Sequence, residues 1–97
     1  MKHLDREEVT RLVDLFGTQQ RDELARVLRG YSPEALAELK ALIWLGRDAD
    51  WPGHWDALVI EARAKVDEST PGHLTETADL ANLLTAGLER LEESGRL

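Results

Sequence analysis

The hydrophobic positions of this chain recur every three or four residues, the spacing of amphipathic helices. The clearest case is residues 33–45, which we predict as one helix. Ser32 supplies an N-cap oxygen, Pro33 suits the first helical position, and Gly46 suits a left-handed residue directly after the helix. Because its last turns are apolar nearly all round, this helix should lie in the centre of a core. Its apolar stripe consists of Leu36, Leu39, Leu42, Ile43 and Leu45.

Two shorter helices are predicted before this central one. The first covers residues 5–16, where Asp5 and Glu8 have the spacing of a capping box, and it ends at Gly17. The second follows and closes at Gly30. Both carry apolar residues at the spacing of one face of a helix.

A fourth helix is predicted after a short polar connection. It runs from near Pro52 to about Lys65, with Asp50 or Trp51 as its cap. Residues 66–72 then break the pattern through a Pro-Gly pair, and a short turn follows.

The last predicted helix, residues 77–93, carries leucines on one face and ends before Gly95. This leucine stripe either packs on the core or forms part of a dimer seam. Since no segment alternates with the period of a strand, the expected fold class is all-α. We expect a single domain over residues 1–97, built as a compact bundle of about five helices without a β-sheet.

Charge is distributed unevenly along the chain. Residues 1–47 carry eight Lys/Arg and eight Asp/Glu, whereas residues 48–97 carry four Lys/Arg and eleven Asp/Glu, so the second half accounts for the net charge of −7. Direct binding to nucleic acid or to an anionic membrane is therefore not expected, because both need a basic surface. A basic protein partner is compatible with this charge, although acidic surfaces commonly serve solubility alone.

Three absences guide the expected location of the protein. The sequence has no cysteine, no apolar run approaching the roughly 20 residues that span a bilayer, and no apolar stretch near Met1 like that of a signal peptide. We therefore expect a cytoplasmic protein.

The segment from Glu38 to Arg47, with the sequence ELKALIWLGR, resembles part of a bacterial family known as domain of unknown function 3775. The resemblance continues through Trp55 and reaches residues 80–89, LANLLTAGLE, which are similar to the closing helix of that family. It covers roughly residues 32–93. It implies a compact helical bacterial domain and no particular activity.

Three tryptophans are unusual in a chain with one Phe and one Tyr. Trp51 and Trp55 are four residues apart and would share a helix face, and Trp44 could fold back toward them. We expect Trp44 and Trp55 to lie in one cluster, with Trp51 more exposed. The alternative is a partly exposed aromatic patch, since Trp is enriched at interface hot spots.

Catalytic and metal-binding chemistry has little support in the sequence. Asp48 and Asp50 are a carboxylate pair beside Trp51, but such a pair more often caps the next helix. The three histidines lack the spacing or the Cys partners of a metal site, so no metal and no cofactor are expected. A nucleophile with its base, a glycine-rich phosphate loop and a nucleophile elbow are all missing, so we expect no enzyme.

The sequence therefore favours a non-enzymatic, small acidic helical protein that binds another protein or forms a homodimer. One alternative is an acidic inhibitor of the phage type that mimics nucleic acid and blocks the basic site of a nucleic-acid-binding protein. Another alternative is an enzyme of unknown class. The candidate interface residues are Trp51, Trp55, Asp48, Asp50, Leu84, Leu88 and Leu91.

Overall fold

A computed structural model of the protein describes residues 1–48 and 54–95, with the side chain of Asp48 left out. These residues contain no strand and form six helices, so the all-α prediction is confirmed, with one helix more than the five expected. In chain order the helices are α1 (Arg6–Gly17), α2 (Arg21–Arg29), α3 (Pro33–Asp48), α4 (Trp55–Ala64), α5 (Thr70–Thr75) and α6 (Leu80–Glu93).

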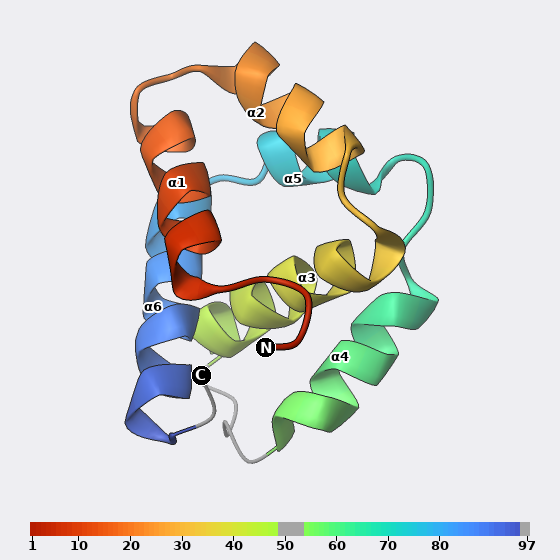
Figure 1. Ribbon diagram of the computed structural model, residues 1–97, viewed down its shortest axis with the longest axis vertical. Coiled ribbons are helices and arrows are strands. Elements are labelled where there is room, and N and C mark those ends of the chain that lie inside the picture. The colour runs from red at the N-terminus through yellow and green to blue at the C-terminus, as the bar shows by residue number, and fades with distance from the viewer. Residues whose placement is uncertain (49–53, 96–97) are drawn as a thin grey trace.

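Helix α3 crosses the middle of the molecule and contacts both α6 and α4 (Figure 1). On one side of it, α1 packs along α6, and Arg6 at the start of α1 forms an ion pair with Glu92 at the end of α6. These two helices are therefore antiparallel. On another side α4 packs mainly against α3, while α2 and α5 pair with each other at the far end of the molecule.

The core forms around α3, as predicted from the apolar residues that surround the last turns of this helix. Leu39 is 2% exposed and Leu42 is fully buried, and Leu36 and Ile43 are buried beside them. Leucines of α1, α2 and α6 close the same cluster from the other sides.

Two of the predicted N-caps are confirmed. The Ser32 hydroxyl accepts a hydrogen bond from the Ala35 backbone N–H at 3.1 Å, and the Asp5 carboxylate accepts one from the Glu8 N–H at 2.8 Å. Each satisfies a backbone donor that has no partner inside its helix. These local sequence signals therefore mark the starts of α3 and α1 correctly.

Replacing Ser32 with alanine is expected to reduce the free energy of unfolding by about 1 kcal/mol, the usual cost of a lost cap. Ser32→Asp is the matched control, because a carboxylate also caps and is favoured by the helix dipole. Urea unfolding of both variants measures the difference. Equal stability of Ser32→Ala and the wild type would contradict the assignment of this cap.

The expected role of Gly46 is wrong. Helix α3 continues through Gly46 to Asp48, and Gly46 instead lies against α6. A Cβ atom at Gly46 would overlap the Leu83 carbonyl oxygen, and one at Gly87 would overlap the Leu42 carbonyl oxygen. The two glycines thus let the backbones of α3 and α6 approach closely, which no residue with a side chain allows.

A side chain from α6 also completes the end of α3. Arg90 Nη1 donates a hydrogen bond to the Leu45 carbonyl oxygen at 2.7 Å. Leu45 belongs to the last turn of α3, where carbonyl groups lack partners within the helix, and a basic side chain there is favoured by the helix dipole.

The segment before the last helix differs from the prediction. Residues 70–75 form the short helix α5, with Pro71 in its first turn, where proline favours a helix start instead of breaking one. Helix α6 then begins at Leu80 and not at residue 77, because Asp79 has a left-handed backbone with φ of 58°. The predicted start of the fourth helix, near residues 50–52, lies outside the described residues.

No helix in the described part of the chain has the length and apolar character needed to cross a membrane.

Candidate functional site

Four of the predicted interface residues lie in the core. Leu84, Leu88 and Leu91 of α6 are at most 7% exposed, and Trp55 of α4 is 5% exposed. Helices α1 and α3 already cover the leucine stripe of α6. These four side chains therefore form no exposed surface of the chain, and the stripe is not left open for a dimer seam.

The other three predicted residues lie at the connection between α3 and α4. Asp50 and Trp51 are outside the described residues, and Asp48 ends α3 with a side chain that is not described. The exposure ranking of Trp51 against the other tryptophans therefore has no test here.

Trp44 and Trp55 both contact the same hydrophobic core, from α3 and α4 respectively. Trp55 is buried, whereas Trp44 is partly buried and packs against the core from α3. The Lys65 ammonium nitrogen lies 5.1 Å from the centre of the Trp44 ring, within the range of a cation–π contact.

A groove of about 230 Å³ lies between the N-terminal segment, α3 and α4. We call it the α4 groove. Its apolar lining comes from Ala37, Trp55, Val59 and Ile60, and its polar lining comes from Lys2, His3, Glu34, Glu38, Asp56 and Arg63. Apolar walls with a polar rim are typical of a site that binds an apolar side chain.

Glu38 holds one wall of this groove in place. Its carboxylate accepts hydrogen bonds from the backbone N–H groups of His3 at 3.0 Å and Leu4 at 2.9 Å through Oε1, and of Lys2 at 2.7 Å through Oε2. The residue is only 2% exposed. Glu38 was not predicted as a site residue, although a carboxylate on the widening apolar stripe of α3 was the available signal.

Ile60 stands at the rim of the α4 groove and is 72% exposed, the exposed large hydrophobic side chain of the described residues. It was not among the predicted interface residues. The buried face of α4 consists of Trp55, Leu58 and Ala62. Ile60 comes two residues after Leu58, which is about 200° around the helix. The position of this isoleucine outside the buried face of the helix therefore indicated an apolar side chain that faces outward.

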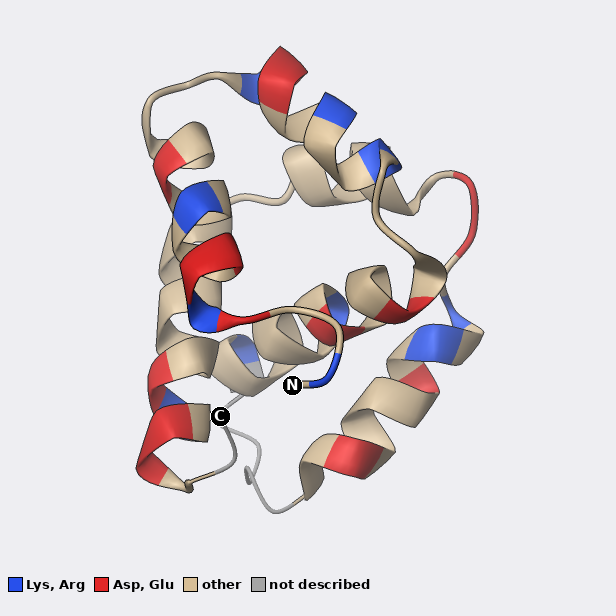
Figure 2. Cartoon of the chain, in the orientation of Figure 1, with Lys and Arg blue, Asp and Glu red and all other residues tan. Residues whose placement is uncertain are grey.

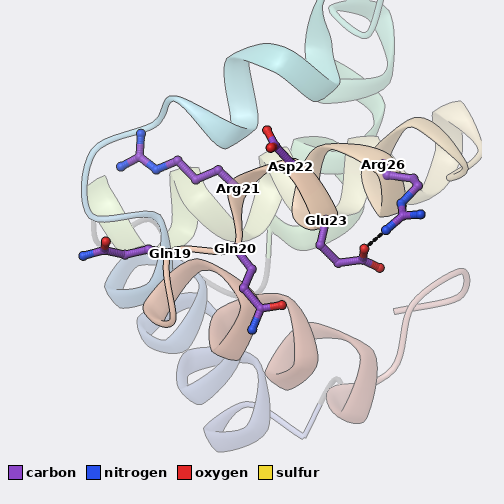
Figure 3. Close-up of a pocket in the computed structure, with 6 residues that line it drawn as sticks. All are labelled: Gln19, Gln20, Arg21, Asp22, Glu23 and Arg26. Atoms are coloured by element: carbon purple, nitrogen blue, oxygen red, sulfur yellow. Dashed lines mark hydrogen bonds and ion pairs between the residues drawn. The ribbon is translucent and has the colours of Figure 1, made fainter.

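A second surface depression lies at the junction of α1 and α2 (Figure 3). It is lined by Gln19, Gln20, Arg21, Asp22, Glu23 and Arg26. Glu23 and Arg26 form an ion pair, and no apolar side chain lines the depression. It offers no hydrophobic anchor and is a weaker candidate than the α4 groove.

Shifted pKa values occur away from the α4 groove. Burial, followed by the negative charge of Glu8, raises the pKa of Tyr31 above its usual value. Hydrogen bonds from the Ser69 hydroxyl and backbone N–H lower the pKa of Asp67. Both have local structural causes, and neither group lines the groove.

The histidines do not gather. His3 lines the α4 groove, while His73 lies beside Ser69 on α5, with 3.4 Å between Nδ1 and the hydroxyl. Within the described residues, no group of three or more His, Asp or Glu side chains is arranged to hold a metal ion.

A family model described as protein of unknown function (DUF3775) matches residues 21–92. The match starts in α2, earlier than the resemblance indicated, and reaches the last turn of α6. It includes the α4 groove apart from Lys2 and His3. No curated protein and no solved structure matches the chain.

Proposed function

The chain belongs to the DUF3775 family of proteins of unknown function, and we propose that it acts by binding a protein partner at the α4 groove, without catalysis. The observation that carries this proposal is the exposed Ile60 side chain at the rim of an apolar groove. Single exposed apolar residues are common on protein surfaces. Here the exposed side chain stands beside the partly buried Val59 in the lining of the α4 groove, so both apolar side chains are open to a partner at the same site.

The energetics favour an apolar anchor from the partner. Fully burying one Leu-, Ile- or Phe-sized side chain contributes about 1.5–3 kcal/mol. Covering Ile60 at the same time removes further apolar area from water. A small number of such anchors carries most of the binding energy in many interfaces.

The rim of the groove supports a protein partner of mixed charge. Lys2 and Arg63 are basic, whereas Glu34 and Asp56 are acidic, so the rim carries no excess of one sign. A nucleic acid would need a basic stripe that neutralises several phosphates. The rim therefore favours a peptide or protein surface over DNA or RNA.

The non-catalytic part of the proposal rests on Glu38, the buried carboxylate of the groove. Both of its oxygens already accept hydrogen bonds from backbone N–H groups. A general base needs an oxygen within reach of the proton that it takes. Glu38 is better suited to fixing the N-terminal segment than to proton transfer.

The acidic-inhibitor alternative has less support. Figure 2 shows acidic and basic positions interspersed on α1 and α2, and acidic positions near the end of α6. Of these, Glu92 is paired with Arg6, and on α4 Glu61 is paired with Lys65. A mimic of nucleic acid would be expected to present a contiguous, unpaired set of carboxylates.

The proposed function predicts that a photo-crosslinking amino acid at position 60 captures a protein in cells that express the chain. The matched control places the same amino acid at Glu7, an exposed position on α1. Mass spectrometry identifies the captured protein, which is then purified and titrated. We expect Ile60→Asp to weaken its binding at least about tenfold, as for a hot-spot residue. Equal capture at both positions would contradict the proposal.

A further inference from the structure

We propose that a second copy of this chain docks on α4 beside the α4 groove, with the two α4 helices antiparallel about a two-fold axis near Ile60. This inference rests on the proposed function, because it uses the same exposed Ile60 at the rim of the groove and names the partner. The inference depends on three features of α4. The helix has an apolar strip on its outer face, and its acidic and basic residues are placed so that two antiparallel copies bring opposite charges together. It also carries the exposed Ile60 side chain beside the α4 groove.

The outer strip of α4 consists of Ala57, Ile60 and Ala64. All three side chains are exposed, on the face opposite the buried Trp55, Leu58 and Ala62. The spacing of three and four residues aligns them in one row along the helix. Along the strip, Ile60 has Ala57 on one side and Ala64 on the other. Because alanine side chains are small, a second helix can approach the strip closely along its length.

The charges beside the strip favour an antiparallel pair. Asp56 lies four residues before Ile60 and Arg63 three residues after it, and both line the α4 groove. Figure 2 shows the same order, with an acidic position near the start of α4 and basic positions near its end. A two-fold axis at Ile60 brings Asp56 of each copy to Arg63 of the other, twice per dimer. A parallel arrangement would place Asp56 against Asp56 and Arg63 against Arg63.

Arg63 is able to make this contact. Within the chain its Nε lies 3.7 Å from Glu34 Oε1, and both side chains are about half exposed, so this ion pair is weak. On the other flank of the strip, Glu61 and Lys65 of the same helix form an exposed ion pair at 3.4 Å, which is weak for the same reason. Asp56 and Arg63 are the two charges that the two-fold arrangement brings together, and their reciprocal pairing favours the antiparallel orientation.

The two-fold arrangement also covers the edge of the groove. Ile60 and the partly buried Val59 both line the groove, and Ile60 of the second copy packs against Ile60 at this edge. Each copy supplies the same strip and the same pair of charged residues, as an isologous interface requires. The strip is small, so we expect a reversible dimer and not a permanent one.

Sedimentation velocity of the full chain over a concentration series up to about 1 mM tests the dimer. The wild type should shift from monomer to dimer, and Ile60→Asp should weaken the dimer at least about tenfold. Asp56→Arg and Arg63→Asp should each be monomeric alone, because each places like charges together. A mixture of these two variants should dimerise, and the double variant Asp56→Arg/Arg63→Asp should recover self-association. Glu7→Arg, on exposed α1, is the control for a general charge effect.

Circular dichroism confirms that each variant is folded before it is compared. A wild type that stays monomeric at every concentration would overturn this inference, and so would a mixture that associates no more than its components. If the crosslinker at position 60 then captures a different protein, the proposed function stands and only the second copy is excluded. If it captures nothing above the Glu7 control, both fail.

Discussion

Gly87→Ala is expected to lower the free energy of unfolding by about 1–3 kcal/mol, although alanine is the better helix former. A Cβ atom at this position would lie 2.9 Å from the Leu42 carbonyl carbon and overlap its oxygen. These are backbone atoms of α3, so no side-chain rotation relieves the overlap. The two helices must separate, and overpacking of this kind typically costs about 1–3 kcal/mol, occasionally more. Urea unfolding followed by circular dichroism measures the loss.

The matched control is Gly17→Ala in the last turn of α1. No heavy atom lies within 4 Å of a Cβ built at Gly17, so the same substitution meets open space there. The higher helix propensity of alanine should then leave stability unchanged or raise it by up to about 1 kcal/mol. If Gly87→Ala were as stable as Gly17→Ala, the close approach of α3 and α6 would be wrong.

Glu38→Ala is expected to lower the free energy of unfolding by about 3 kcal/mol and to release the N-terminal segment. The substitution removes the acceptor of three backbone N–H groups, and one hydrogen bond to a charged group contributes about 1.5–3 kcal/mol. The N–H groups of Lys2 and His3 can turn to water after release, which offsets part of the loss. The buried side chain of Leu4 would leave the core with them.

Two measurements check this second result. Urea unfolding gives the change in stability, and hydrogen exchange should show that the Leu4 amide loses its protection. Glu38→Gln should cost less, because its amide oxygen still accepts. Glu34→Gln, one turn earlier in α3, where the glutamate side chain is exposed, should change stability by no more than about 0.5 kcal/mol. A protected Leu4 amide in Glu38→Ala would contradict the role given to Glu38.

Much of the local structure could be predicted because it depends on neighbours in the sequence. The caps at Ser32 and Asp5, the end of α2 at Gly30 and the burial of Leu39 and Leu42 all follow from short patterns. The left-handed backbone of Asp79 and the short helix α5 could not be predicted from short sequence patterns. Residues 70–79 are compatible with a turn as well as with a helix.

The candidate site was predicted poorly, for a different reason. Helical spacing identifies an apolar face and leaves open what covers it. The leucine stripe of α6 was compatible with a dimer seam until α1 and α3 were seen to cover it. Conversely, Ile60 lies off the stripe of α4, and the packing of α4 mainly against α3 leaves it exposed.

The sequence by itself determined the all-α class, most helix boundaries and the central place of α3, because propensity, capping and periodicity act over a few residues. Only the tertiary structure decided the roles of Gly46 and Glu38. A glycine after an apolar run is compatible with the end of a helix or with a close approach of two helix backbones. In this protein α6 packs against Gly46, so the glycine serves the close approach. A glutamate on the apolar face of a helix indicates burial and leaves open which groups it contacts. The N-terminal segment, more than thirty residues away in the chain, provides the backbone N–H groups that Glu38 accepts from. Both roles depend on contacts between residues distant in the sequence, which no local pattern encodes.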